Sequence, residues 1–349
     1  MIHLGADISK RFSYVVALDE QEKVVWERQV DNSRGEWQRL REELPAGEAV
    51  QTAMEAGWNW GITYDLLEEV GLCPVLVEAR KARAIADAYI KTDKLDAYAL
   101  ARLLKSGLAP RVHVPERSVR DKRNVLRHRM WLVGWKTSLK NRMHGILDRN
   151  HVTRPEVSDL FGRQGKTWLK SLELPVVDQR LLKAHEELYD DVVRQLREME
   201  HWVEEELKDN PYLPSLLTLP GVGKILGAVI ALEVDTIERF RAPEKLCSYA
   251  GLVNSTYASG DKVRHGGIMP TCNKNLRYAY VEAAWTAVRT SPYFAAIFRR
   301  LKAAKGPKSA IVAIARRLCM ISWSCMKERR AYREQTYRFR PGRLAPALA

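Results

Sequence analysis

Short apolar segments alternate with polar turns over the first eighty residues of the chain. Three such segments are rich in branched and aromatic side chains and predict consecutive β-strands at residues 2–8, 13–18 and 24–30. The pattern then alternates, with helices expected over 34–44, 59–70 and 80–106 and strands over 49–54 and 73–77. Ser33 is the expected N-cap of the first helix. Three strands followed by β-α-β-α indicate an α/β layer with a mixed sheet, the order used by ribonuclease H-like folds.

Two long helices are expected in the middle of the chain, over residues 118–150 and 178–208, with an unassigned connection over 151–177. The second helix repeats apolar residues every seven positions, at Leu182, Tyr189, Leu196 and Val203, with His185, Val192 and Met199 at the complementary position. The first helix has a similar spacing, at Val125, Leu132, Trp135, Leu139, Met143 and Ile146. The pattern fits two helices of an ordinary bundle or a paired or intersubunit coiled coil. The charge outside the seam favours the coiled coil.

The last region contains a short glycine-rich turn, Leu219-Pro220-Gly221-Val222-Gly223-Lys224, before an apolar helix over 225–234. A Pro-Gly-x-Gly turn between helices is typical of a helix-hairpin-helix element, in which backbone N–H groups approach a DNA phosphate. A nucleotide P-loop is disfavoured because Ile225 stands where Ser or Thr should follow the lysine. Closing helices are expected over 276–290 and 308–328.

A second glycine-rich stretch, residues 257–267, combines one serine with several basic residues. Ser259 is followed by Lys262, Arg264 and His265. A serine beside glycine and cations could clamp a phosphate or act as a nucleophile. From these residues alone, a plain flexible turn is favoured.

The charge of the chain is high and unevenly distributed. The net charge is +14, and residues 111–150 hold eleven Lys or Arg against three acids, while 299–343 hold fourteen against two. Residues 186–209 hold ten acids against three bases. This distribution predicts two segments that face nucleic acid and one that faces solvent or protein.

The cysteines and the apolar segments indicate a cytoplasmic protein. The five cysteines form no C-x-x-C pair and no zinc-like spacing with histidine, so we expect buried, reduced thiols. We find no signal peptide and expect no membrane-spanning segment.

Four acidic residues fall at the ends of predicted elements. Asp7 and Glu55 end strands, and functional groups of open α/β sheets gather beyond such carboxyl ends. Asp93 and Asp96 lie three residues apart on a helix and can share one divalent cation. Lys91 and Lys94 flank them and suit a site that also holds phosphate. The order Asp, Glu, Asp-x-x-Asp therefore predicts a metal-dependent phosphoryl-transfer site of the nuclease type.

These motifs together resemble the DEDD transposases of the "IS one-ten" class of insertion sequences, which are related to the Piv- and MooV-type DNA invertases. The resemblance is carried by Gly5–Lys10, Met54–Gly57, Lys91–Ala97 and Leu219–Gly223, and it continues through Phe240, Leu246, Tyr249–Leu252, Ser259-Gly260 and Asn273-x-x-Leu276-Arg277. It covers nearly the whole chain and is weakest across 110–210.

The resemblance implies a fold, a chemistry and a set of partners. It implies a ribonuclease H-like (RuvC-like) domain over 1–110 that binds magnesium, or alternatively manganese, through Asp7, Glu55, Asp93 and Asp96. It implies a helical, coiled-coil region over 111–210 and a mostly helical transposase domain over 211–349, in which Ser259 forms a covalent phosphoserine link to cleaved DNA. It further implies donor and target DNA, a structured non-coding guide RNA (bridge or seeker RNA) and a homo-oligomer, dimer or tetramer, in a prokaryotic, nucleoid-associated setting.

The residues expected to contact nucleic acid are Lys91, Lys94, Gly221, Gly223, Lys224, Lys262, Arg264, Asn273 and Arg277. The chain departs from the family pattern at Gly57, where threonine is usual, at Ala6, and at residues 269–272, which replace Lys-x-Gly before Asn273. Two other functions fit the same residues. One is a metal-dependent junction resolvase or nuclease that uses water in place of Ser259, and the other is an inactive relative that only binds nucleic acid.

Overall fold

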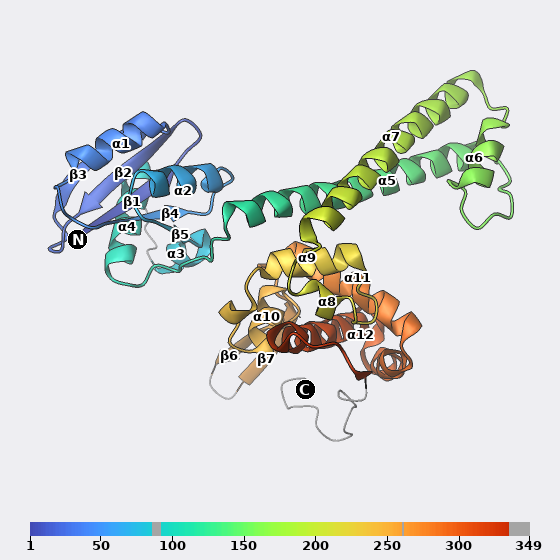
Figure 1. Cartoon of the computed structure of the whole chain (residues 1–349). Helices are drawn as coiled ribbons and strands as arrows, with labels where there is room; N and C mark the ends of the chain where they lie inside the picture. Colours follow the sequence, from blue (N-terminus) through green and yellow to red (C-terminus); the bar gives the residue numbers. More distant parts are fainter. Residues whose placement is uncertain (86–91, 260–261, 335–349) are drawn as a thin grey trace. The chain divides into compact units, whose positions relative to one another are not determined.

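The chain forms two compact units, Met1–Pro115 and Glu116–Ala349. The structure is a computed structural model that describes residues 1–85, 92–259 and 262–334, coloured from blue to red along the sequence in Figure 1. The first unit is a mixed α/β structure, and the second is mostly helical.

The first unit is built on a five-stranded mixed sheet with the order β3-β2-β1-β4-β5. The strands are β1 (Ile2–Ile8), β2 (Phe12–Leu18), β3 (Val24–Asp31), β4 (Val50–Glu55) and β5 (Pro74–Val77). β1, β2 and β3 pair antiparallel, whereas β1, β4 and β5 run parallel. All five strands lie within two residues of their predicted positions.

Helices cover both faces of this sheet. α1 (Arg34–Glu43) and α2 (Trp60–Glu69) pack on one face, where Trp37, Leu40 and Leu67 join the core that contains Val15 and Ala17. α4 (Asp93–Lys105) covers the other face, where its alanines and leucines contact Val16, Leu18, Ala53 and Val77. Successive residues of β2 therefore pack into different cores, because successive side chains of a strand point to opposite faces of the sheet. The predicted cap of α1 is confirmed, because the Ser33 side chain accepts a hydrogen bond from the Glu36 N–H at 3.3 Å.

The helix expected over 80–106 is described as α3 (Ala79–Ile85) and α4, with residues 86–91 outside the described part. Lys91 belongs to that gap.

The second unit begins with two long antiparallel helices, α5 (Arg117–Arg149) and α7 (Val176–Leu207). Ion pairs join them along their length, at Lys122–Glu206, Arg129–Glu200 and Arg149–Asp178. The four residues of the predicted seam of α7, Leu182 to Val203, are all buried. The two helices pack on each other within one chain. Trp135 was expected in the seam of α5, but it is 48% exposed, whereas Leu132 and Leu139 are buried.

A short helix lies in the connection between these two long helices. α6 (Arg163–Lys170) contributes Leu169 to their shared core, together with Phe161 of the same connection.

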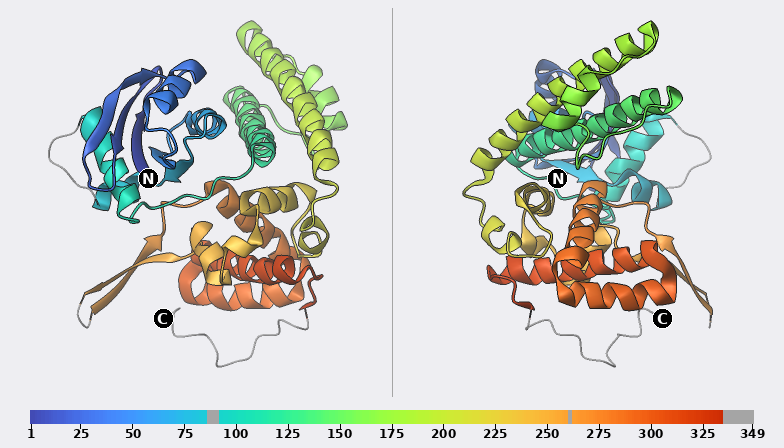
Figure 2. Two further views of the ribbon diagram at one scale, coloured as in Figure 1. Left: turned by 60° about the vertical axis from the view of Figure 1, so that its left-hand side comes forward. Right: turned by 90° about the vertical axis from the view of Figure 1, so that its right-hand side faces the viewer.

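The remainder of the second unit is a helical body with a projecting hairpin. Its elements are α8 (Leu213–Leu216), α9 (Lys224–Val234), the 3₁₀ turn η1 (Ile237–Arg239), α10 (Pro243–Tyr249), β6 (Asn254–Ser259), β7 (Lys262–Ile268), α11 (Lys274–Thr290) and α12 (Pro292–Glu328). Figure 2 shows β6 and β7 extending away from the helices. The expected flexible loop over 257–267 is therefore wrong, because most of these residues form an antiparallel pair.

Helix α12 is interrupted at Gly306, which has φ 78° and ψ 166° and precedes Pro307. Only glycine adopts such a conformation without strain. The helix is long and apolar enough to cross a membrane, contrary to the expectation from sequence. Its buried residues, including Ile314, Leu318 and Cys325, belong to the core of the second unit. Core packing therefore accounts for its apolar composition.

The cysteines are all free, and three of them, Cys247, Cys319 and Cys325, are buried. Cys272 is half-buried and Cys73 is exposed, so the expectation of uniformly buried thiols is wrong for these two. Burial raises the pKa of the Cys319 thiol well above its usual value, which keeps that thiol protonated.

Candidate functional site

Two of the four candidate carboxylates lie side by side at one edge of the sheet. β1 and β4 are parallel and adjacent, with Ala6 paired to Met54. One residue further along, this register brings Asp7 next to Glu55, at the strand separation of about 5 Å. Both residues are half-buried. The prediction that both acids end neighbouring strands is consistent with this register.

The first turn of α4 carries the other two candidates. Thr92 caps this turn by accepting a hydrogen bond from the Leu95 N–H at 3.2 Å. Asp93 and Asp96 follow in the turn, the first exposed and the second half-buried. Their spacing of three residues places both on neighbouring positions of the helix surface.

Gly5 allows α4 to lie directly on β1. A Cβ atom at this position would lie 1.8 Å from the Ala97 carbonyl oxygen and 2.6 Å from the Ala101 nitrogen. The backbone of α4 therefore contacts the backbone of β1 two residues before Asp7 and one residue after Asp96. This contact brings the acids of the helix to the same end of the sheet as Asp7 and Glu55.

The flanking lysines have different positions. Lys94 forms an ion pair with Glu27 of β3, and Glu27 also accepts a hydrogen bond from the Tyr14 hydroxyl at 2.9 Å. The hydrogen bonds from Lys94 and Tyr14 lower the pKa of Glu27, so this carboxylate stays charged. Lys94 thus has an intramolecular partner. Lys91 lies outside the described residues.

The carboxylate set has the right donors for a hard cation but is not gathered around one point. Oxygen ligands are those preferred by Mg²⁺. Among residues 1–85, 92–259 and 262–334, no group of three or more His, Cys, Asp or Glu side chains is placed to hold a metal ion. To coordinate one ion, the side chains of the sheet pair and the helix pair must turn towards each other.

The hairpin of the second unit carries the candidate nucleophile. The register pairs position 259 with Lys262 and Tyr257 with Arg264. Cross-strand partners share one face of a hairpin, as do alternate residues of a strand, so these four positions lie on the same face. Lys262 and Arg264 are exposed, and Tyr257 is 70% exposed. The side chains of Ser259 and His265 lie outside what the structure describes.

The Pro-Gly-x-Gly turn joins α8 to α9, so it lies between two helices as the predicted helix-hairpin-helix element requires. Gly221, however, has φ +81°, and a Cβ atom there would lie 2.1 Å from the Ala283 carbonyl oxygen of α11. Its contact with α11 explains this glycine without a DNA phosphate. Gly223 and Lys224 are exposed at the start of α9, and the Lys224 side chain forms an ion pair with Glu204 at 2.9 Å.

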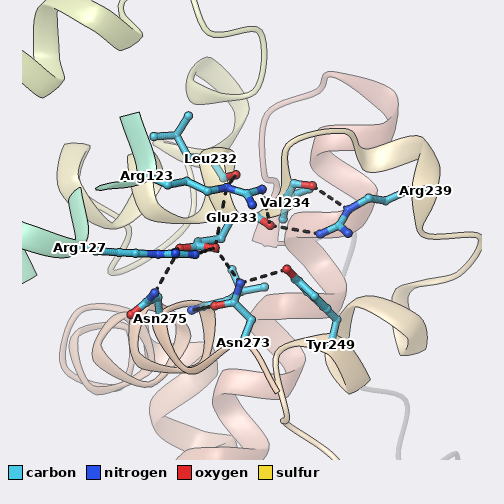
Figure 3. Close-up of polar contacts among 10 residues, drawn as sticks. Arg123, Arg127, Leu232, Glu233, Val234, Arg239, Tyr249, Asn273 and Asn275 are labelled. Atoms are coloured by element: carbon cyan, nitrogen blue, oxygen red, sulfur yellow. Dashed lines mark hydrogen bonds and ion pairs between the residues drawn. The ribbon is translucent and has the colours of Figure 1, made fainter. Parts of the chain in front are cut away.

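A buried carboxylate of α9 forms a polar cluster that we did not predict (Figure 3). Glu233 is 3% exposed and accepts two hydrogen bonds from Arg127 of α5, both at 3.0 Å. It also accepts hydrogen bonds from Asn273 at 2.7 Å and Asn275 at 3.2 Å. Arg123 donates to the Leu232 carbonyl at 2.7 Å. This Glu233 cluster joins the base of α5 to α9 and α11.

The protonation state of the Glu233 cluster follows from these contacts. Burial acts to raise the pKa of Glu233, but hydrogen bonds from Arg127 and Asn273 and the charge of Arg123 together lower it. Glu233 is therefore ionised at neutral pH. Burial lowers the pKa of Arg123, although the nearby carboxylate opposes this effect.

Two residues expected to contact nucleic acid also make contacts within the protein. The Asn273 side chain caps α11 by accepting a hydrogen bond from the Leu276 N–H at 3.0 Å, and it donates to Glu233. The Arg277 guanidinium donates to the Met269 carbonyl and to the Cys272 sulfur at 2.7 Å. These contacts hold the chain where β7 leads into α11, so the assignment to a nucleic-acid surface is not needed to explain either residue.

Comparison with known proteins finds two family models that match this chain, one in its N-terminal part and one in its C-terminal part. A model for the DEDD domain of IS110-type proteins, described as a transposase, matches residues 4–152. A second model, described as the transposase IS116/IS110/IS902 family, matches residues 214–299. The first match contains all four carboxylates, and the second contains the hairpin and Glu233 itself, whereas Arg123 and Arg127 of the cluster fall within the first.

This chain is also similar to individual transposases and insertion-element proteins. The transposase for insertion sequence element IS1111A from Coxiella burnetii is 25% identical, over 95% of this chain and 91% of that protein. The insertion element IS110 uncharacterized 43.6 kDa protein from Streptomyces coelicolor is 23% identical, over 94% of both chains. The transposase for IS1328 from Yersinia enterocolitica is 26% identical, over 56% of this chain and 59% of that protein.

Proposed function

Since the chain belongs to the IS116/IS110/IS902 family of transposases, we propose that it cleaves and rejoins DNA with the carboxylate edge of the first unit and the hairpin of the second. The carboxylate edge consists of Asp7, Glu55, Asp93 and Asp96. The observation that carries the proposal is the register of β1 and β4, which puts Asp7 beside Glu55 where α4 crosses the sheet.

The carboxylate edge is the proposed site of phosphoryl transfer. The mixed sheet order, with three antiparallel strands followed by two parallel ones, supports a ribonuclease H-like domain. A bound Mg²⁺ or Mn²⁺ would stabilise negative charge on the attacking and leaving oxygens of a phosphodiester. The role of the four side chains is to bind this ion and thereby to orient the scissile phosphate.

The hairpin supplies the proposed nucleophile. The Ser259 hydroxyl oxygen would bond to the scissile phosphorus, while the bond from phosphorus to the leaving nucleotide oxygen breaks. The serine proton passes to a base, and the leaving oxygen gains a proton. Lys262 and Arg264 share the hairpin face with this position and would neutralise the phosphate. Rejoining reverses the same exchange, so the phosphodiester is conserved without ATP.

The partners follow from this chemistry. We propose donor and target DNA as substrates, a structured guide RNA that selects them, and a homo-oligomer that acts in the cytoplasm at the nucleoid. The cationic segments 111–150 and 299–343 support a polyanionic partner. The assignment of the nucleophile to one unit and the carboxylates to the other is compatible with activation by assembly.

One denaturing gel tests the proposed chemistry. Wild-type protein, guide RNA, labelled DNA and magnesium should give cleaved DNA and a covalent protein–DNA adduct. Ser259→Ala should lose the adduct and recombination, whereas Ser255→Ala, on the same strand, should retain both. Asp93→Asn should lose cleavage, whereas Glu68→Gln, an exposed acid of the same unit, should not.

The same gel identifies the alternative functions. A nuclease that uses water would give cleaved DNA without an adduct, even in the wild-type protein. An inactive relative would bind DNA and produce neither product. Either result would contradict the serine mechanism.

A further inference from the structure

A basic groove lies at the base of the hairpin, between β6, β7 and the second half of α12. Asn254, Thr256 and Gly267 line one side, and Lys305, Lys308 and Arg316 line the other. The volume is about 730 Å³, within the range of about 300 to 1,000 Å³ that is usual for ligand sites. None of the described residues that line it is acidic.

The three cations of the groove differ from Lys224 and Lys327, two other basic residues of the same unit. Lys224 and Lys327 form ion pairs, with Glu204 and Glu238. Lys305, Lys308 and Arg316 form no ion pair with any residue in the described part of the chain, although Arg316 is half-buried. Three cations that lie together without a protein anion repel one another, so the binding of an anion from outside the chain is favoured.

The break in α12 contributes to this arrangement. Gly306, with its positive φ, and Pro307 separate Lys305 from Lys308, yet both lysines line the groove. Beyond the break, Lys308 and Arg316 are eight residues apart on one helix, which corresponds to about 12 Å. Cations at this separation can contact different phosphates along one strand.

We propose that this groove binds the sugar–phosphate backbone of a single nucleic-acid strand. Grooves that bind single strands combine cations along the backbone with polar contacts, here from Asn254 and Thr256. A double helix, whose major groove alone is about 12 Å wide, is too broad to enter a cavity of this size. The inference rests on the proposed function, because it names a surface for the nucleic acid on which the transposase acts.

The groove is separate from the hairpin face that carries position 259. The alternation of β6 places Thr256 on the face opposite Tyr257. A strand in the groove would therefore be held beside the hairpin without occupying the proposed catalytic face. Loss of binding here and loss of the nucleophile are consequently distinguishable.

The test compares two charge-matched double variants in the full chain. Lys305→Gln with Lys308→Gln removes two groove cations, and Arg299→Gln with Lys302→Gln removes two exposed cations from the first half of the same helix. Binding of a fluorescent single-stranded oligonucleotide is measured without magnesium over about 50 to 400 mM salt. Each lost phosphate contact on a single strand lowers the slope of log affinity against log salt by about 0.7. For the Lys305/Lys308 variant, which loses two contacts, the slope should fall by about 1.4. If the affinities of this variant and the wild-type protein become equal near 1 M salt, the variant should bind about 25-fold more weakly at 0.1 M salt.

A second variant places negative charge directly in the groove. A Cβ atom at Gly267 meets nothing within 4 Å, so Gly267→Glu fits there and should weaken binding. Single-stranded DNA, RNA of the same sequence and duplex DNA are compared. If only the binding of single-stranded DNA is weakened, the groove holds a substrate strand. If only the binding of RNA is weakened, the groove holds the guide. Both results support the proposed binding of a single strand. Equal slopes for the two double variants, or a loss confined to duplex DNA, would overturn the proposal even if the serine mechanism holds.

Discussion

Glu233 of the second unit and two acids at the carboxylate edge of the first unit have opposite surroundings. Glu233 is buried and accepts hydrogen bonds from an arginine and two asparagines of other elements. Asp93 and Glu55, at the carboxylate edge, are exposed or half-buried and form no ion pair with any residue that the structure describes. A carboxylate that stabilises the fold has its negative charge satisfied by protein donors. A carboxylate that binds an ion or a substrate needs oxygens available to it, so the surroundings of Asp93 and Glu55 are compatible with the proposed role.

The largest expected effect is on catalysis at the carboxylate edge. Glu55→Gln should reduce DNA cleavage by about 100- to 1,000-fold, as when one group that stabilises transition-state charge is removed. The melting temperature without metal should stay constant or rise, because repulsion from Asp7 is relieved. Cleavage assays and thermal unfolding of the same preparation measure both. Normal cleavage would remove Glu55 from the site.

The largest stability effect should come from the Glu233 cluster. Glu233→Ala leaves Arg123 buried and uncompensated, so the free energy of unfolding should fall by about 3 to 5 kcal/mol. Glu204→Gln, which breaks an exposed pair with Lys224, should change it by less than about 1 kcal/mol. Urea denaturation compares the two variants. Equal effects would mean that Glu233 is no more structural than a surface acid.

A smaller effect should appear when pH is varied. The pKa of Glu233 is lower in the folded protein than its ordinary value of 4.5, so the carboxylate binds protons more readily after unfolding. Its contribution is therefore complete above about pH 4.5 and is lost as the pH falls through the lower folded value. Glu233→Gln should reduce the loss of stability on acidification by an amount on the order of 1 kcal/mol. Unfolding curves of both proteins from pH 7 to pH 3 test this, and parallel losses would contradict it.

The smallest expected effect concerns Lys94. Its partner Glu27 is neither a buried acid like Glu233 nor a member of the carboxylate edge. If Lys94 contacts phosphate, Lys94→Gln should weaken DNA binding by about twofold to fivefold, the weight of one contact. Glu27→Gln frees the lysine and should strengthen binding. DNA affinity at fixed salt is the measurement. Changes in the same direction for both variants would leave Lys94 with a structural role only.

The strands β1, β2, β4 and β5 could be predicted from the sequence because they are short apolar segments that the fold mostly buries. β6 and β7 could not, since Tyr257 and Val263 are exposed and Gly266 and Gly267 are typical of loops. Without a core beneath a strand, hydrophobic periodicity gives no signal. The hairpin is defined by its backbone pairing instead.

The candidate site was predictable to a similar extent. Asp7 and Glu55 end strands that alternation reveals, so their meeting at one edge followed from topology. Glu233 was missed because it is a single acid in an apolar helix, and its partners Arg127 and Asn273 lie 106 and 40 residues away. The packing of Gly221 was missed for the same reason, because its neighbour Ala283 is brought to it only by the folded chain.

The contact at Gly5 also has a consequence for motion. Backbone atoms of β1 and α4 touch there, and backbone atoms have no alternative rotamers with which to absorb a displacement. A displacement of the strand against the helix is therefore resisted at this point, between Asp7 and Asp96. If these two acids bind one ion, rotation of their side chains is a smaller change than movement of the backbones beneath them.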